Sequence, residues 1–89
     1  MKFTEEYLAQ AHKHCIFHVN EIEESGSCGC FSCLIVFPSK DIIEWTDDDN
    51  PKGKTAICPN CGIDSVIGSA SGYPIDDPEF LSSLNEKYF

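Results

Sequence analysis

The chain has 89 residues, 42% of them hydrophobic, which predicts one small domain with a limited core that needs a further source of stability. Fifteen acidic residues outnumber six lysines, and no arginine is present. The net charge of −9 argues against direct nucleic-acid binding, and only a local patch of Lys52 and Lys54 is left as a possible phosphate-binding surface. The first 20 residues contain no apolar signal core and no later stretch has membrane-spanning length, so we expect a cytoplasmic protein.

The first predicted element is a helix from Thr4 to Glu24, with Thr4 as its N-cap and acidic residues in its first turn. Apolar residues recur at intervals of three and four, which predicts one buried face. That face needs a partner, either the rest of the domain or a second copy of the chain in a homodimer. The residues on it are Tyr7, Leu8, Ala11, Cys15, Val19 and Ile22.

The same predicted helix carries a cluster of potential metal ligands. His14 and His18 are four residues apart, with His12 and Cys15 beside them, so two or three ligands can share a helix face. A pair of histidines at this spacing is a weak pattern, and free cysteine is commonly a small buried apolar residue. We therefore favour a structural role and leave a second metal site as the alternative.

A group of three cysteines follows the Ser-Gly-Ser sequence that ends this segment. Cys30 and Cys33 form a Cys-x-x-Cys pair, and Cys28 lies two residues before it. Two cysteines at this spacing place their thiolates on one side of a tight turn. The spacing favours Cys30 with Cys33 as ligands, and Cys28 is the alternative first-pair ligand.

The middle of the chain predicts short elements. Residues 34–37 read as a buried strand that Pro38 stops, and Ser39 reads as the N-cap of a short helix over 40–45 that buries Ile42, Ile43 and Trp45. The acidic segment 47–53 is predicted to be a solvated loop.

A second Cys-x-x-Cys pair, Cys58 and Cys61, lies 24 residues after the first. Pro59 fixes the backbone early in its turn, and Gly62 permits the left-handed conformation that lets amides point at the sulfurs. Together the two pairs predict one tetrahedral Cys₄ site for Zn²⁺. Iron in the same four cysteines and disulfide bonding are the alternatives.

The second pair is flanked by predicted strands at 54–57 and 63–67, which would pair as the hairpin of a zinc ribbon. Asp64 and Ser65 are interpreted as a strand end, because no histidine in the C-terminal half accompanies them. After a turn-rich connector, a C-terminal helix is predicted with Asp76 or Asp77 at its cap and Pro78 in its first turn. Its apolar face carries Phe80, Leu81, Leu84 and Tyr88.

Four sequence features together resemble a group of small, functionally uncharacterised bacterial and phage-associated cytoplasmic proteins. The features are CGCFSCL at 28–34, the single Trp45, TAICPNCGIDSVIG at 55–68 and SGYP at 71–74. The resemblance covers residues 25–89 and implies zinc binding and a cytoplasmic setting. The knuckles also resemble those of zinc ribbons and rubredoxins, which is a likeness of fold and fixes no function.

These features predict an α+β fold in which a small zinc ribbon with rubredoxin-like knuckles and short antiparallel hairpins is flanked by two helices. We expect one zinc-binding domain, with an N-terminal helix over 1–24, the ribbon over 25–72 and the C-terminal helix over 73–89. The predicted function is a structural zinc module without enzymatic activity that contacts a protein partner, with a basic surface favoured by the charge. An iron electron carrier and a redox-sensing zinc–thiolate switch that uses Cys28 are the alternatives.

Overall fold

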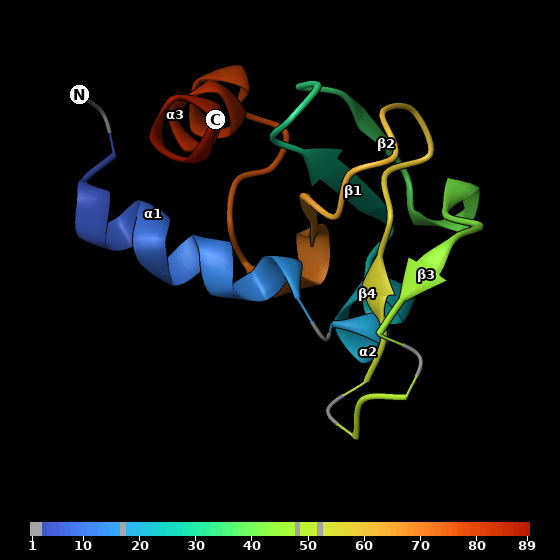
Figure 1. The fold of residues 1–89 in the computed structure, drawn as a ribbon. Helices are drawn as coiled ribbons and strands as arrows, with labels where there is room; N and C mark the ends of the chain where they lie inside the picture. Colours follow the sequence, from blue (N-terminus) through green and yellow to red (C-terminus); the bar gives the residue numbers. More distant parts are fainter. Residues whose placement is uncertain (1–2, 17, 48, 52) are drawn as a thin grey trace.

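The computed structural model describes residues 3–16, 18–47, 49–51 and 53–89. In the described part, two helices lie on one side of the molecule and two small sheets lie on the other (Figure 1). The helices on the first side are α1 (Glu5–His12) and α3 (Pro78–Tyr88), and a third helix, α2 (Val19–Glu24), lies beside the sheets. The predicted α+β class, with small antiparallel sheets flanked by helices, is confirmed.

Three short strands form the first sheet. The central strand β1 (Ser27–Cys30) pairs antiparallel with β2 (Val36–Pro38) on one side and with β5 (Val66–Gly68) on the other. The second sheet contains β3 (Trp45–Thr46) and β4 (Thr55–Ala56), also antiparallel. The predicted pairing of the strands around the second cysteine pair is therefore wrong, because β4 and β5 belong to different sheets.

The predicted helix from Thr4 to Glu24 is interrupted, which corrects the sequence analysis. Thr4 caps α1 as expected, its side chain accepting from the Tyr7 amide at 3.1 Å. A 3₁₀ turn over Lys13–Cys15 follows, and Ile16 is extended before α2 begins. Tertiary contacts account for the break: the Val19 amide donates to the Lys54 carbonyl at 3.1 Å, which fixes α2 against the second sheet.

The interruption lets the two halves of the segment pack into different hydrophobic clusters. The first cluster lies between α1, α3 and one face of the first sheet, and contains Leu8, Ala11, Cys15, Phe31, Ile67, Ile75, Phe80, Leu81 and Leu84. The second cluster lies between α2 and the two sheets, and contains Ile22, Cys28, Cys30, Phe37, Ile42, Ala56, Cys58 and Val66. One straight helix could not place both Leu8 and Ile22 in these positions.

Two further predictions in the middle of the chain are wrong in part. The helix expected over 40–45 is a single 3₁₀ turn, Ser39–Asp41, because the Ser39 hydroxyl donates to the Ser25 carbonyl at 2.5 Å instead of capping a helix. Ile42 is buried as expected, whereas Ile43 is 80% exposed. In the strand expected to be buried, only Phe37 is buried and Val36 faces outward, as alternation along an edge strand requires.

The C-terminal helix α3 agrees with the sequence prediction. Asp77 is its N-cap, with a carboxylate oxygen 2.9 Å from the Glu79 amide, and Pro78 occupies the first turn. Phe80 is completely buried and stacks against Tyr73, with ring centroids 6.0 Å apart. The Phe80 ring also makes a T-shaped contact with the Phe3 ring, with centroids 5.4 Å apart, so an aromatic cluster joins α3 to α1.

Candidate metal centre

Four cysteines from the two predicted pairs come together. Their Sγ atoms all lie within 4.8 Å of one another, and no other group of three or more potential metal ligands is this close among the residues that the structure describes. Cys30 and Cys58 are buried, and Cys33 and Cys61 are half-buried. These four positions are the ones that the spacing favours as metal ligands, Cys30, Cys33, Cys58 and Cys61.

Two of the six separations between the sulfur atoms have the length expected in a tetrahedral metal site. Sγ of Cys30 lies 3.6 Å from Sγ of Cys61, and Sγ of Cys33 lies 3.7 Å from Sγ of Cys58. A tetrahedron with zinc–sulfur bonds of about 2.3 Å has sulfur atoms about 3.8 Å apart. All six cysteines of the chain are free thiols, so the structure gives no support to the disulfide alternative.

The two cysteine pairs form knuckles with the same hydrogen-bond pattern. In the first, the Ser32 amide donates to Sγ of Cys30 at 3.4 Å, and the Leu34 amide donates to the Cys30 carbonyl at 2.9 Å. In the second, the Asn60 amide donates to Sγ of Cys58 at 3.4 Å, and the Gly62 amide donates to the Cys58 carbonyl at 3.0 Å. Amide donors of this kind stabilise negative charge on metal-bound sulfur.

Leu34 adopts the backbone conformation that glycine has in the second knuckle. Its φ is 65° and that of Gly62 is 76°, both in the left-handed region. This conformation costs leucine about 1–2 kcal/mol in steric strain, which glycine avoids because it has no Cβ. The sequence departs from the usual knuckle pattern at Leu34, but the turn does not.

We predict that Gly62→Ala lowers the free energy of unfolding of the metal-loaded protein by about 1 kcal/mol, because alanine is strained at positive φ. An added Cβ at Gly62 meets no atom within 4 Å, so the loss reports conformational strain alone. Gly26→Ala is the matched control, because Gly26 also has open space but no positive φ. Urea denaturation followed by circular dichroism measures both variants, and equal effects would contradict this explanation.

Surrounding groups shift the pKa values of the clustered thiols in different directions. Burial raises the pKa of Cys30 to about 12, although the Ser65 hydroxyl, 3.1 Å from its sulfur, opposes the shift. For Cys33, burial is outweighed by hydrogen bonds from Asn60, Cys30 and Cys58, which lower the pKa to about 7. A divalent cation would offset the cost of burying thiolate charge here, since metal binding releases the thiol protons.

Helix α3 is attached directly to the first knuckle. The Asn85 side-chain amide donates to the carbonyls of Phe31 and Ser32, at 3.0 and 3.2 Å. The Phe31 side chain enters the first hydrophobic cluster, while its neighbour Cys30 belongs to the second. The four-cysteine cluster therefore lies where the two halves of the core meet. The sequence did not predict this position, because it depends on a contact between residues 54 positions apart.

Cys28, the alternative first-pair ligand, lies outside the four-sulfur cluster. Its side chain is completely buried in the second hydrophobic cluster, and burial raises its pKa to about 11. A thiol in this state is protonated at neutral pH and behaves as a small apolar side chain.

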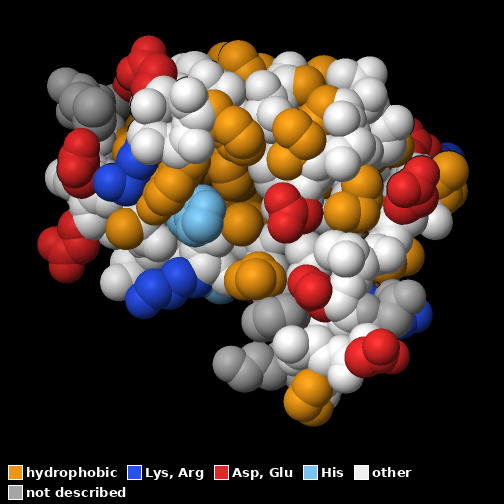
Figure 2. All heavy atoms as spheres, in the orientation of Figure 1, with side chains coloured by type: hydrophobic (Ala, Val, Ile, Leu, Met, Phe, Trp, Pro, Cys, Tyr) orange, Lys and Arg blue, Asp and Glu red, His pale blue; other side chains and the backbone are white. Residues whose placement is uncertain are grey.

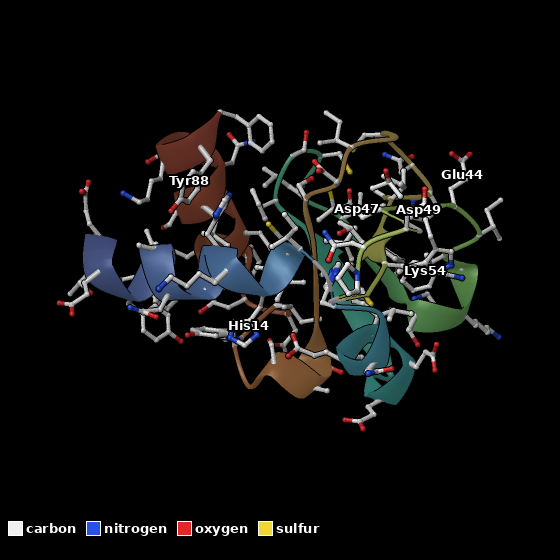
Figure 3. The ribbon with its side chains drawn as sticks, turned by 60° about the horizontal axis from the view of Figure 1, so that its bottom comes forward. His14, Glu44, Asp47, Asp49, Lys54 and Tyr88 are labelled. Carbon is white, nitrogen blue, oxygen red and sulfur yellow. The ribbon has the colours of Figure 1, made fainter. Side chains whose placement is uncertain are left out.

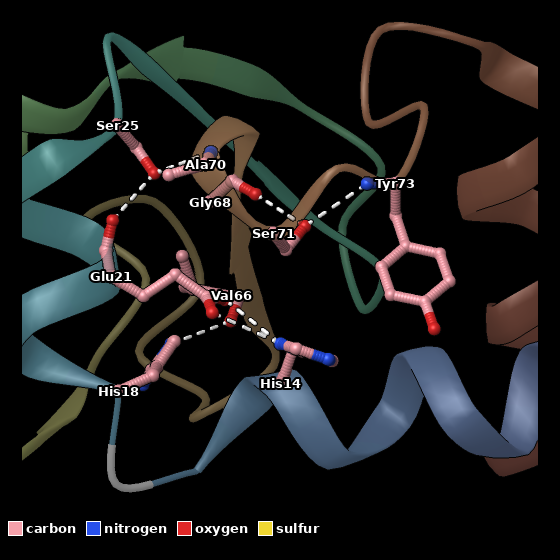
Figure 4. Close-up of polar contacts among 9 residues, drawn as sticks. All are labelled: His14, His18, Glu21, Ser25, Val66, Gly68, Ala70, Ser71 and Tyr73. Carbon is pink, nitrogen blue, oxygen red and sulfur yellow. Dashed lines mark hydrogen bonds and ion pairs between the residues drawn. The ribbon is translucent and has the colours of Figure 1, made fainter.

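The histidines of the N-terminal segment divide between two places, because the predicted helix is interrupted. His12 and Cys15 line one cavity, and His14 and His18 line another with Glu21. His14 Nδ1 lies 3.1 Å from the Glu21 carboxylate, and His18 Nε2 lies 2.8 Å from the Val66 carbonyl oxygen (Figure 4). The potential ligand atoms of His12, His14, Cys15 and His18 do not form a cluster like that of the four sulfurs. The alternative of a second metal site in this segment therefore gains no support.

Buried His18 is part of the break between α1 and α2. Its Nε2 carries the proton that the Val66 carbonyl accepts, while its Nδ1 is buried without a hydrogen-bond partner in the described part of the protein. Burial lowers the pKa of His18, which keeps the ring neutral. This interaction joins the N-cap of α2 to β5 and has a structural role.

One of the lysines that the sequence analysis left open, Lys54, lies at the end of the acidic loop between β3 and β4. The Asp47 carboxylate accepts a hydrogen bond from the Thr55 hydroxyl at 2.8 Å. Lys54 directly precedes β4, and β4 pairs with β3, which ends just before Asp47. By the register of the two strands, Asp47 and Lys54 lie at the same end of the second sheet, and Figure 3 labels Asp49 in the same region of its view. Lys52 lies outside the described residues. Lys54 therefore stands in an acidic surrounding, which does not favour phosphate binding.

Comparison of the chain with protein-family models, curated proteins and solved structures finds no match. Among the described residues, no helix is long and apolar enough to cross a membrane. The four-sulfur cluster is therefore the main observation from which a function can be argued.

Proposed function

We propose that the protein is a structural zinc module that presents an acidic surface to a protein partner and has no catalytic role. The four sulfur atoms at tetrahedral spacing carry the first part of this proposal. A closed set of four cysteines leaves no coordination position for water or substrate, which is typical of structural zinc and untypical of catalytic zinc. Bound zinc would supply folding free energy at the junction of two small hydrophobic clusters.

Metal content tests this proposal. We expect inductively coupled plasma mass spectrometry of the purified protein to find one zinc per chain, because each chain provides one four-sulfur cluster. A chelator strong enough to remove zinc should abolish the cooperative unfolding transition. Fully folded protein without any metal would overturn the proposal.

Iron in the same site is the second candidate, because FeS₄ and ZnS₄ have the same geometry and the knuckles fit either ion. Leu34 and Ile63, which follow the two knuckles, are exposed, so an electron-transfer partner would find apolar surface near the metal. Iron would give a red protein whose visible absorption bleaches on reduction. A colourless preparation with stoichiometric zinc removes this candidate.

The redox-switch alternative has weaker support. It requires Cys28 to exchange with a ligand or to be oxidised, yet Cys28 is completely buried and its pKa is raised to about 11. Cysteine oxidation favours exposed thiolates. A structural thiol is the better interpretation.

The partner is proposed from the charge. With a net charge of −9, and with four thiolates around Zn²⁺ contributing a further −2, the surface favours basic proteins and repels phosphates. Figure 2 shows acidic side chains distributed over the visible face, with hydrophobic side chains between them. Electrostatic complementarity of this kind accelerates association and selects partners. We expect the partner in the cytoplasm.

A further inference from the structure

A cavity of about 320 Å³ lies beside the metal centre, between the C-terminal end of α3 and the first 3₁₀ turn. It has more apolar than polar lining, and it combines aromatic side chains with one carboxylate. Its lining residues are His12, Cys15, Ile16, Phe31, Asp64, Ser65, Tyr88 and Phe89. None of the ligands of the four-sulfur cluster lines it, so it is a separate site.

Three aromatic rings meet at this cavity at oblique angles. The ring of Phe31 is tilted by 53° to that of Tyr88, with centroids 6.3 Å apart, and by 48° to that of Phe89, with centroids 5.7 Å apart. The His12 ring stacks on Tyr88 at 3.8 Å. Rings arranged as a corner present electron-rich faces to a group that enters between them, and such faces attract cations.

Asp64 supplies negative charge to the same cavity. It is exposed, and no lysine forms an ion pair with it among the residues that the structure describes. Its carboxylate lines the same cavity as His12 and Cys15, and its negative charge acts to raise the pKa of both side chains. Burial lowers the pKa of His12, which disfavours a positive charge on the ring beside Asp64, and burial raises the pKa of Cys15 to about 11, which keeps the thiol uncharged at neutral pH.

From these observations we infer that the cavity binds an arginine side chain of the basic protein partner, with the guanidinium between the aromatic rings and Asp64. This inference rests on the proposed function for the partner, and the site is new. Arginine fits better than lysine because its planar guanidinium stacks on aromatic rings and pairs with a carboxylate through two parallel hydrogen bonds. The chain contains no arginine of its own, and the cation nearest to these rings is Lys87, whose Nζ lies 5.5 Å from the centroid of the Tyr88 ring and 3.6 Å from the Glu5 carboxylate.

The floor of the cavity is connected to the metal centre. Ser65 lines the cavity, and its hydroxyl lies 3.1 Å from Sγ of Cys30. Phe31, which forms one aromatic wall, follows Cys30 directly in the chain. A metal bound by the four cysteines would therefore hold two sides of the cavity in place, and the experiment must use the metal-loaded protein.

The probe is a blocked arginine peptide, Gly-Gly-Arg-Gly-Gly, titrated into ¹⁵N-labelled metal-loaded protein and followed by NMR. We expect saturable shifts at Phe31, Asp64, Tyr88 and Phe89, with a dissociation constant in the millimolar range or weaker, since a single guanidinium offers only one set of cation–π contacts and one ion pair. The same peptide with citrulline, which has the shape of arginine without its charge, should bind at least about tenfold more weakly. Equal binding of both peptides, or shifts elsewhere, would overturn the inference.

Two variants with the same change of charge complete the test. Asp64→Asn should weaken binding of the arginine peptide by about three- to tenfold, as expected for a partly exposed ion pair with good geometry. Asp76→Asn is the control, because Asp76 is also exposed but does not line the cavity. Equal effects of the two variants would mean that net charge alone attracts the peptide. A protein that contains zinc and fails to bind the peptide would refute this inference and leave the metal site intact.

Discussion

Cys30→Ala should abolish stoichiometric metal binding and the cooperative unfolding transition. The variant removes one of four thiolates from a site whose binding free energy is on the order of 10 kcal/mol or more in small zinc peptides. Small domains are typically stable by only about 5–15 kcal/mol, so losing the metal removes most of the stability of this protein. Metal analysis after gel filtration, together with circular dichroism during heating, measures both losses.

Cys28→Ala is the matched control, since Cys28 and Cys30 are both completely buried on β1 and both changes remove one sulfur from the same cluster. It should keep one metal per chain and lose only about 1 kcal/mol of stability, the cost of a small cavity. If Cys28→Ala released the metal and Cys30→Ala retained it, the ligand assignment would be wrong.

Phe80→Ala is expected to produce the largest effect away from the metal, a loss of about 3–5 kcal/mol in the free energy of unfolding. Phe80 is completely buried, and its ring contacts those of Phe3, Tyr7 and Tyr73, which join α3 to α1. Truncation removes these contacts and leaves a cavity between the helices. Urea denaturation of the metal-loaded protein gives the change directly.

The conservative variant Phe80→Leu separates ring contacts from burial, since it retains most of the apolar volume and should cost less than Phe80→Ala. Both variants should bind one metal per chain under conditions in which they are folded, because Phe80 lies in the first hydrophobic cluster, whereas the four cysteines of the candidate metal site belong to the second cluster or pack against it. A large loss of metal from folded Phe80→Leu would show that the two clusters do not act separately.

The candidate metal site was predictable because its signal is local. A Cys-x-x-Cys spacing determines a tight turn within four residues. Two such turns form a four-sulfur site when the fold brings them together, so the ligands can be named without knowing the rest of the fold. The cap of α3 was predictable for the same reason, since Asp77 and Pro78 act on the adjacent backbone. The choice between Cys28 and Cys30 was open in the sequence, and the geometry of the four sulfurs resolves which thiols come together.

The remaining features depend on distant contacts that a local pattern does not contain. Periodicity predicted one helix through residue 24, but the Val19 amide bonds to Lys54 and the His18 ring bonds to Val66, which competes with helix continuation. Strand β4 lies within the predicted range 54–57, whereas β5 begins only at Val66 and overlaps the end of the predicted range 63–67. The two strands pair with β3 and β1, respectively, instead of with each other. The aromatic cavity near Asp64 was missed because His12 reaches it from the other end of the chain.

The most direct measurement of the central claim is X-ray absorption at the zinc edge of the purified protein. We predict a single shell of four sulfur atoms at about 2.3 Å, which is the distance for zinc bound by four cysteines. The spectrum of Cys28→Ala should be the same, because Cys28 lies outside the four-sulfur cluster. A shell that includes nitrogen or oxygen, or a protein that folds without zinc, would contradict the account.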